Sequence, residues 1–310
     1  MSRLSVVYAA ALACAAAGCL SPARAPERPA GAFVIASFNV RTPGDTGPRA
    51  WYRRLPVVAE VVRSRGFDLF GVQEMTPPEA MIIEMELPEF GRVGCGREKN
   101  RGGEAMYVYY RKDRFDCLDN GTFWLSQTPD LPGSKYPGAG CPRVCTWAKL
   151  KDRVTGKTFR YFNTHLDHIS SQARWDGMNV LLEIGVRPAL ARGETVLLTG
   201  DLNARLDPAD DVDSLRRVSG EALVKAAAEN PIALVATVLD DTIVSSETPH
   251  RGTFRTFHGY REEPRSRIDY IFASKGVRVL DHETVNDRPD GIFPSDHYPV
   301  MATVVLPGEK

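Results

Sequence analysis

The sequence predicts an α/β fold with a large hydrophobic core. Short apolar runs typical of buried strands alternate along the chain with segments of helical period, and this alternation is the pattern of α/β proteins. The 310 residues, of which 43% are hydrophobic, suffice for one large domain or two average ones. Several of the apolar runs end in a polar side chain that can bind a metal or hold a proton, which indicates a shared site.

Strands are expected where apolar runs lie between polar or turn-forming residues. These runs span 33–39, 69–73, 105–110, 146–151, 158–164, 195–199, 268–273 and 298–305. Helices are expected at 55–65 and 172–186, where apolar residues recur near the helical period. Glycine and proline cluster at 129–142, and this composition predicts a long surface loop that rims the site.

The N-terminal segment has the features of an export signal. An apolar stretch from Leu4 to Ala17 follows Arg3; it is too short to span a membrane and has the size of a signal-peptide core. The residues that end at Cys19 (Ala-Ala-Gly-Cys) resemble a bacterial lipobox, in which the cysteine receives a lipid and becomes the new N-terminus. The alternative is ordinary cleavage at an Ala-x-Ala site, with Cys19 as an incidental thiol.

These features predict three segments of the chain. We expect a signal peptide over 1–18, an extended tether rich in proline, alanine and arginine over 19–31, and one domain over 32–310. The mature protein is then expected in the bacterial periplasm or cell envelope, anchored to the membrane through a lipid on Cys19.

Cysteine usage agrees with export. Cys95, Cys117, Cys141 and Cys145 are an even number of thiols that could form two disulfides in an oxidising compartment, with three connectivities open. Cys141 and Cys145 resemble half of a zinc site, but no second Cys or His pair follows at a suitable spacing.

The charge balance disfavours a protein that tracks long duplex DNA. The chain has 39 basic and 39 acidic residues, so its formal net charge is zero, and it has no long basic run. Proteins that bind duplexes usually carry a basic surface, because neutralising phosphates supplies most of their nonspecific affinity. A nucleic-acid partner is therefore not favoured, although the composition does not exclude one.

Six short motifs place polar side chains at the ends of apolar runs. They are Ser37-Phe38-Asn39-Val40, Val72-Gln73-Glu74-Met75, Asn163-Thr164-His165-Leu166-Asp167-His168, Leu198-Thr199-Gly200-Asp201-Leu202-Asn203, Arg267-Ile268-Asp269-Tyr270-Ile271-Phe272 and Ser295-Asp296-His297-Tyr298-Pro299-Val300. Hydrolysis of a phosphoester needs a cation, a base for water and donors to the phosphate oxygens, and these side chains provide each part.

In this order, from about Ala32 to Leu306, the motifs resemble the endonuclease/exonuclease/phosphatase superfamily of deoxyribonuclease I-like, metal-dependent phosphoesterases. The resemblance implies a single domain, because only one fold could bring such scattered motifs together. It implies a four-layer α/β sandwich, in which two mixed β-sheets pack face to face with helices on the outside and the active site lies at one end.

The resemblance also implies a metal site. Glu74 follows a buried strand and would be the principal ligand, with Asn39 beside it. Asp296 is expected to complete the site or hold a second ion. Oxygen ligands of this kind suit Mg²⁺ or Mn²⁺ better than zinc.

Asp201 and Asn203 are two residues apart after an apolar strand, so in an extended conformation both side chains face the same side. Gly200 would let the backbone approach closely. By resemblance, Asp201 orients and deprotonates the attacking water, while Asn203 holds the phosphate or the water.

By resemblance, two histidines bind phosphate oxygens or steady the leaving group, and each needs a partner to fix its tautomer. Asp269 is the expected partner of His297. Glu104 is the expected partner of His165, because the segment around Glu104 resembles the family strand whose glutamate pairs with the first histidine.

Three further residues are expected to contact the substrate. Strand alternation puts His165 and Asp167 on one face and His168 on the other, so Asp167 could line the site. Phe257 and His258 lie in a segment that resembles the loop bordering the active site in several branches of the family.

Together these features predict an exported, Mg²⁺-dependent phosphoesterase that acts by direct in-line attack of a water activated by the metal and by Asp201. No activated Ser or Cys nucleophile stands out. A small-molecule or lipid-linked phosphate is favoured as substrate, either a diester or a monoester, and the protein is expected to be a monomer. The alternatives are a nuclease with the same site and, from another class, a noncatalytic envelope-binding lipoprotein.

Overall fold

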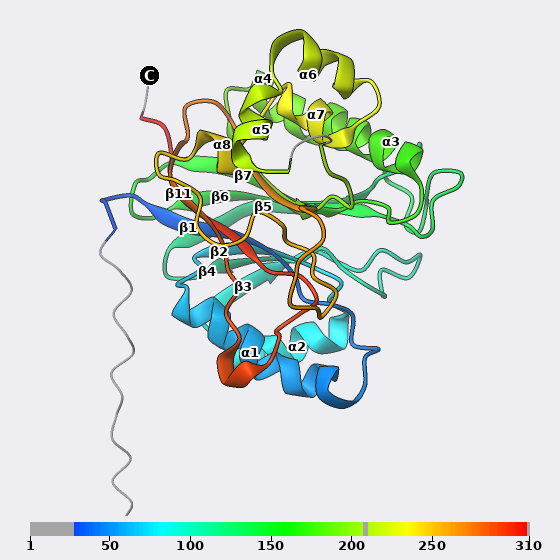
Figure 1. The fold of residues 1–310 in the computed structure, drawn as a ribbon, viewed down its shortest axis with the longest axis vertical. Coiled ribbons are helices and arrows are strands. Elements are labelled where there is room, and N and C mark those ends of the chain that lie inside the picture. Colours follow the sequence, from blue (N-terminus) through cyan, green and yellow to red (C-terminus); the bar gives the residue numbers. More distant parts are fainter. Residues whose placement is uncertain (1–27, 207–209, 309–310) are drawn as a thin grey trace, which may run out of the picture.

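The computed structural model describes residues 28–206 and 210–308 (Figure 1). The expected signal peptide, Cys19 and most of the expected tether lie outside the described residues. The last tether residues contact the folded body, since the Arg28 guanidinium donates to Asp68 at 2.5 Å and to the Gly66 carbonyl at 2.9 Å. Within the described part of the chain, no helix combines the length and the apolar character needed to cross a bilayer.

Two six-stranded mixed sheets form the centre of the molecule. The first has the order β11-β12-β1-β2-β4-β3 and consists of β1 (Phe33–Asn39), β2 (Leu69–Gln73), β3 (Phe90–Val93), β4 (Val108–Arg111), β11 (Arg278–Thr284) and β12 (Val300–Val305). The second has the order β5-β6-β7-β8-β10-β9 and consists of β5 (Phe115–Trp124), β6 (Val144–Asp152), β7 (Thr158–His165), β8 (Thr195–Asp201), β9 (Asp240–Asp241) and β10 (Asp269–Ala273). In each sheet one central pair is parallel, β1 with β2 and β7 with β8.

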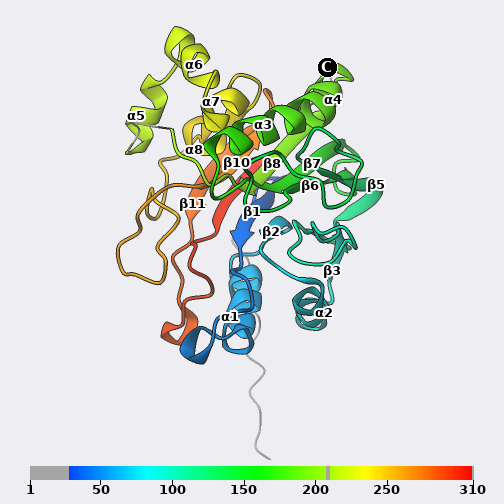
Figure 2. The same ribbon diagram turned by 90° about the vertical axis from the view of Figure 1, so that its right-hand side faces the viewer.

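Helices cover the outer face of each sheet, as Figures 1 and 2 show. The first sheet is covered by α1 (Trp51–Ser64) and α2 (Pro77–Glu86). The second is covered by α3 (Ser171–Leu181), which continues through a π-helical turn (Leu182–Val186) into α4 (Arg187–Ala191), and by α5 (Val212–Arg217), α6 (Gly220–Ala227), α7 (Pro231–Ala236) and α8 (Thr242–Ser245). Short 3₁₀ turns lie at Gly47–Arg49 and Pro289–Gly291. The expected four-layer sandwich is confirmed.

The pattern of β1 shows how the sequence builds these layers. Every residue of this strand is buried. Phe33 and Ile35 point into the core between the two sheets, while Val34, Ala36 and Phe38 pack toward α1. A strand buried on both faces reads as a continuous apolar run rather than an alternating one, and such runs were the signal for the central strands.

The expected strands are all present, although the one expected at 105–110 begins at Val108. The structure adds β3, β5, β9 and β11. The sequence of β5 includes Asp119, Asn120 and Gly121, and the strand lies at a sheet edge with a register shift after Cys117. An edge strand is half exposed and tolerates polar and turn-forming residues, so its sequence does not read as an apolar run.

The two disulfides that the four cysteines of the domain could form are absent from the described part of the chain. Cys95, Cys117 and Cys141 are partly exposed and Cys145 is buried, and all four are free thiols. Cys117 on β5 lies opposite Leu150 of β6, well along that strand from Cys145. Cys145 is packed in the core beneath α3, where burial raises the pKa of its thiol.

A buried polar seam joins the two sheets. The Asn163 side chain on β7 donates to the carbonyls of Val72 at 2.9 Å and Tyr107 at 3.0 Å, and it accepts from Gln73 Nε2 at 2.7 Å. Gly71 makes this approach possible, because a Cβ atom there would lie 2.3 Å from the Asn163 side chain. The sheets therefore meet through hydrogen bonds between buried groups and not only through apolar packing.

We predict that Gly71→Ala destabilises the protein by about 1–3 kcal/mol or more, because the added methyl group overlaps Asn163 and Thr199 at the seam. The free energy of unfolding from chemical denaturation measures this loss. Gly44→Ala is the matched control, since nothing lies within 4 Å of a Cβ atom at Gly44, and it should change stability by less than about 0.5 kcal/mol. Equal stabilities of the two variants would contradict the close approach.

Candidate active site

The ends of the central strands meet at one edge of the sandwich. Asn39 is the last residue of β1, and Glu74 follows the end of the parallel strand β2. In the second sheet, His165 and Asp201 end the parallel strands β7 and β8 and lie opposite each other, and Asp269 begins the antiparallel strand β10 opposite Asp201. Strand register thus gathers the side chains of each sheet, and the packing of the two sheets brings both groups to one edge.

Asn39 connects the two sheets at this edge. Its side-chain amide donates to Glu74 Oε1 at 3.0 Å and to Asp201 Oδ2 at 2.9 Å. Its side-chain oxygen accepts from the backbone N–H of Arg41 at 2.9 Å. One buried amide therefore holds two carboxylates from different sheets in a fixed relation.

Glu74 is held ionised in a left-handed backbone conformation. Its φ angle is 65°, which a non-glycine residue adopts only where the surroundings require it. Burial alone would raise the pKa of Glu74, but hydrogen bonds from Asn39 and from the Thr42 backbone N–H, together with the charges of His297 and Arg41, lower the pKa overall.

Asp201 is a fully buried carboxylate of the site. Its side chain is 2% exposed, and it lies 3.4 Å from His165 Nε2 and 3.8 Å from His297 Nε2. Burial, and then the negative charge of Asp269, raise the pKa of Asp201 to about 7. Its other oxygen accepts from the backbone N–H of Asn203, which also has a left-handed φ of 46°. A carboxylate with a pKa near neutrality is suited to take up a proton.

His297 is held protonated. Its Nδ1 lies 2.9 Å from Asp269 Oδ2, which is the pairing expected from the sequence. Burial would lower the pKa of His297, but the carboxylates of Asp269 and Asp201 outweigh burial and raise it to about 10. The Phe257 ring packs 4.9 Å from the imidazole and restricts its movement.

His165 is held neutral. Burial, followed by the charges of Arg143 and Arg97, lowers its pKa well below the ordinary value. Asn203 Nδ2 lies 2.8 Å from its Nε2, and its buried Nδ1 has no hydrogen-bond partner. The expected pairing with Glu104 is wrong: Glu104 binds Arg97 at 2.6 Å, because backbone hydrogen bonding sets these two residues against each other across a turn.

Glu74, His165, Asp201 and His297 line one cleft of about 530 Å³, and Asn39 and Asp269 support them from outside its lining. The cleft is lined by Arg41, Thr42, Glu74, Arg97, Glu104, Cys141, Arg143, His165, His168, Asp201, Asn203, Phe257, Ser266, Ile268, Asp296 and His297. The volume suits a small molecule or part of a larger one.

The sequence profile of the Endonuclease/Exonuclease/phosphatase family matches residues 36–297. The chain belongs to this family. Its members are metal-dependent hydrolases of phosphoester bonds, and so is this protein, which has their fold and their convergent carboxylates and histidines.

Solved structures of family members agree with this assignment. A family protein from Bacteroides thetaiotaomicron shares 30% identity over 90% of this chain and 99% of its own, with a TM-score of 0.76. The mannosyl-6-phosphatase of the same organism shares 30% identity over 88% of this chain and 100% of its own, with a TM-score of 0.74. TDP2 of D. rerio, solved with single-strand DNA product, shares the fold at 17% identity, over 88% of this chain and 98% of its own, with a TM-score of 0.63. A comparison with curated protein sequences found no match.

The acidic end of the cleft fits the divalent cation on which the family depends. The Glu74 and Asp201 carboxylates and the His297 imidazole bring polar atoms within 4.8 Å of one another, and the two carboxylates are the candidate ligands because His297 is protonated. Asp296 also lines the cleft, 3.7 Å from Arg41. Clustered carboxylate oxygens are the ligands that Mg²⁺ and Mn²⁺ prefer. Asn39 holds these carboxylates in place, while its own role as a ligand stays a prediction.

A second cluster, made of Cys141, Asp167 and His168, is less suited to a cation. Arg143 Nη2 lies 3.0 Å from His168 Nδ1, so a positive charge already occupies the space beside it. Asp167 is fully buried and accepts from the backbone N–H groups of Gly140, Ile169 and Ser170 at 2.8–3.0 Å. Asp167 therefore fixes the end of the 129–142 loop and the start of α3, and it does not line the cleft as expected.

The expected substrate contact of His258 is also wrong. Its side chain is fully buried and stacks on Phe293 at 4.6 Å and on Tyr298 at 4.2 Å, and burial lowers its pKa to about 4. Along this strand-like segment neighbouring side chains point to opposite sides, so Phe257 lines the cleft while His258 packs beneath it.

Sequence reasoning missed several residues of the cleft wall, chiefly Arg41, Arg97, Arg143 and His168. Arg41 lies two residues after Asn39, just beyond the end of a strand, and this position could have identified it as a site residue from the sequence. Arg97 and Arg143 precede strands in loops whose course the sequence does not reveal. The expectation that the 129–142 loop rims the site agrees with Cys141, which lines the cleft.

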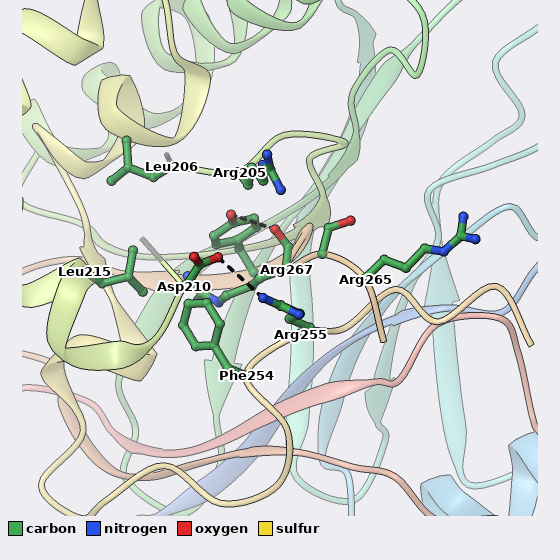
Figure 3. A pocket seen from close by; sticks show the side chains of 10 residues that line it. Arg205, Leu206, Asp210, Leu215, Phe254, Arg255, Arg265 and Arg267 are labelled. Atoms are coloured by element: carbon green, nitrogen blue, oxygen red, sulfur yellow. Dashed lines mark hydrogen bonds and ion pairs between the residues drawn. The ribbon is translucent and has the colours of Figure 1, made fainter. Parts of the chain in front are cut away.

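A smaller hollow of about 10 Å³ shares Ser266 with the cleft, and Figure 3 shows the side chains that line it. It has room for about one water molecule. Two of its arginines pair with carboxylates: Arg255 lies 3.5 Å from Asp210 (Figure 3), and Arg267 binds both oxygens of Asp241 at 2.8 Å. We place no substrate there.

We predict that Glu74→Gln weakens Mg²⁺ or Mn²⁺ binding at least tenfold, because the change removes a charge from the cation site and keeps the shape of the side chain. Isothermal titration calorimetry of the purified domain measures the affinity. Glu86→Gln, an exposed glutamate at the end of α2, is the control and should bind the ion like the parent. An unchanged affinity in Glu74→Gln would place the ion elsewhere.

Proposed function

We propose that this family member is an exported, Mg²⁺-dependent phosphoesterase that acts on a small-molecule or lipid-linked phosphate. The observation that carries the proposal is the convergence of Glu74, Asp201, His165 and His297 in one cleft of about 530 Å³. The zero net charge supports a small substrate over long duplex DNA. The similarity to a mannosyl-6-phosphatase makes a sugar phosphate the first substrate to test.

The roles of the side chains follow from their protonation. Asp201, with a pKa near 7, accepts a proton from the attacking water, and Asn39 and Asn203 hold it in position. His297, protonated against Asp269, donates a hydrogen bond to a phosphate oxygen as charge grows there. His165, which is neutral and lies 2.8 Å from Asn203, contacts the phosphate on the side of the cleft where Asn203 lies.

A divalent cation bound by Glu74 and the neighbouring carboxylates would supply charge neutralisation at the phosphate oxygens. Asp296 is proposed to complete that site, and Phe257 to contact the substrate. Water attacks directly in this scheme. The described residues of the cleft lining include one serine, Ser266, and one cysteine, Cys141; neither side chain is hydrogen-bonded to a base, and burial raises the pKa of Cys141.

We predict that the mature domain hydrolyses bis-p-nitrophenyl phosphate, p-nitrophenyl phosphate or mannose 6-phosphate with Mg²⁺, and that EDTA stops the reaction. Asp201→Asn should lower kcat by about 10²- to 10⁴-fold, because the proton acceptor is lost while the side chain keeps its shape. Asp213→Asn, at an exposed aspartate of α5, is the matched control.

A panel that adds phospholipids and single- and double-stranded nucleic acids tests the substrate class. Preferred cleavage of nucleic acid would replace the proposed substrate class with the nuclease alternative. Full activity of Asp201→Asn would remove Asp201 from the mechanism.

We also propose that the chain is exported and anchored through a lipid on Cys19. The prediction is that the full-length protein, expressed in a bacterium with labelled palmitate, carries the label and sediments with membranes, and that Cys19→Ala loses both properties. Cys14→Ala, within the expected signal peptide, is the control and should keep both. A labelled Cys19→Ala protein would contradict the anchor.

A further inference from the structure

The catalytic roles above leave two buried arginines of the cleft unused. Arg143 comes directly before β6, and its side chain is only 6% exposed. The side chain of Arg97 is 14% exposed. Both line the same cleft as His165 and Asp201. A buried guanidinium costs free energy unless its N–H groups and its charge are matched.

The two arginines differ in how far their charge is matched. Arg97 binds Glu104 at 2.6 Å and lies 3.6 Å from Glu98, so two carboxylates balance its charge. The nearest carboxylate to Arg143 belongs to Asp167, 3.9 Å from its Nε, which is beyond hydrogen-bond reach. The oxygens of Asp167 are already bonded to three backbone N–H groups.

Two of the three guanidinium nitrogens of Arg143 are also unpaired within the described structure. Its Nη2 faces His168, while Nε and Nη1 are buried without a hydrogen-bond partner. A planar guanidinium with free N–H groups is suited to bind phosphate oxygens in a bidentate manner. The arrangement is therefore that of an anion-binding group inside the substrate cleft.

We propose that Arg143 is a specificity-determining residue that binds the unesterified oxygens of a terminal phosphate, so that the cleft prefers phosphomonoesters over phosphodiesters. This inference rests on the proposed function, because it concerns the phosphate that is hydrolysed there. A phosphomonoester has one more negative oxygen than a diester, and that oxygen has no ester group to keep it away from a guanidinium. At the acidic end of the cleft, by contrast, carboxylates already surround the guanidinium of Arg41, which lies 3.3 Å from Asp45, 3.7 Å from Asp296 and 3.9 Å from Glu74.

The test compares p-nitrophenyl phosphate with bis-p-nitrophenyl phosphate, which release the same leaving group. Arg143→Met should lower kcat/KM for the monoester by roughly 10- to 100-fold, which is the effect of losing one charge-assisted hydrogen bond. The same change should lower kcat/KM for the diester by less than about threefold. Arg143→Lys keeps the positive charge but lacks the planar pair of N–H donors, so it should recover part of the lost kcat/KM for the monoester. Arg187→Met, at an exposed arginine of α4, is the control.

Equal losses for the two substrates, or no loss for either, would overturn the proposal. If Arg143→Met does not fold, as thermal denaturation would reveal, the comparison of wild type with Arg143→Lys decides. In that case a ratio of monoester to diester kcat/KM that is the same in the wild type and in Arg143→Lys overturns the proposal.

Calorimetry with inorganic phosphate separates this inference from the proposed function. The wild type should bind phosphate at least tenfold more tightly than Arg143→Met or Arg143→Lys, whereas the monoanion dimethyl phosphate should show no such difference. If the protein hydrolyses no phosphoester, the proposed function is rejected, whereas the phosphate-binding result for Arg143 is unaffected. Equal phosphate affinity of all variants would reject the role of Arg143.

Discussion

The whole site depends on one buried amide, the side chain of Asn39. It donates to Glu74 from the first sheet and to Asp201 from the second, at 3.0 and 2.9 Å. Both carboxylates are largely buried, and without this shared donor the repulsion between their negative charges would be less well compensated. The amide therefore sets the separation between the group suited to a cation and the group suited to accept a proton.

This junction is rigid because the sheets behind it are locked together. The seam formed by Asn163, Gln73 and the close approach at Gly71 satisfies buried polar groups from both sheets. At the cleft itself, Glu74 and Asn203 have left-handed backbone conformations that cost free energy in isolation. The packing of the sandwich stabilises these two conformations, and they direct both side chains into the cleft.

The cleft has an acidic wall and a basic wall. Carboxylates gather around Glu74 and Asp296, whereas Arg143 presents a guanidinium with free N–H groups. Between these walls lie two histidines in opposite protonation states, His297 charged by its contact with Asp269 and His165 neutral through burial. Two residues of one type thus serve different purposes because their surroundings differ.

From the sequence, continuous apolar runs identified the inner strands, and the resemblance to the family supplied the four layers and the convergence of the site. Strand register brings His165, Asp201 and Asp269 together within the second sheet, whereas His297, from the segment before β12, joins them through the packing of the two sheets. Only the tertiary structure decided which neighbours these residues have. Glu104 binds Arg97 and not His165, His258 and Asp167 are buried, and Arg143 enters the cleft, because loop paths and side-chain packing across the two sheets leave no periodic signal in the chain.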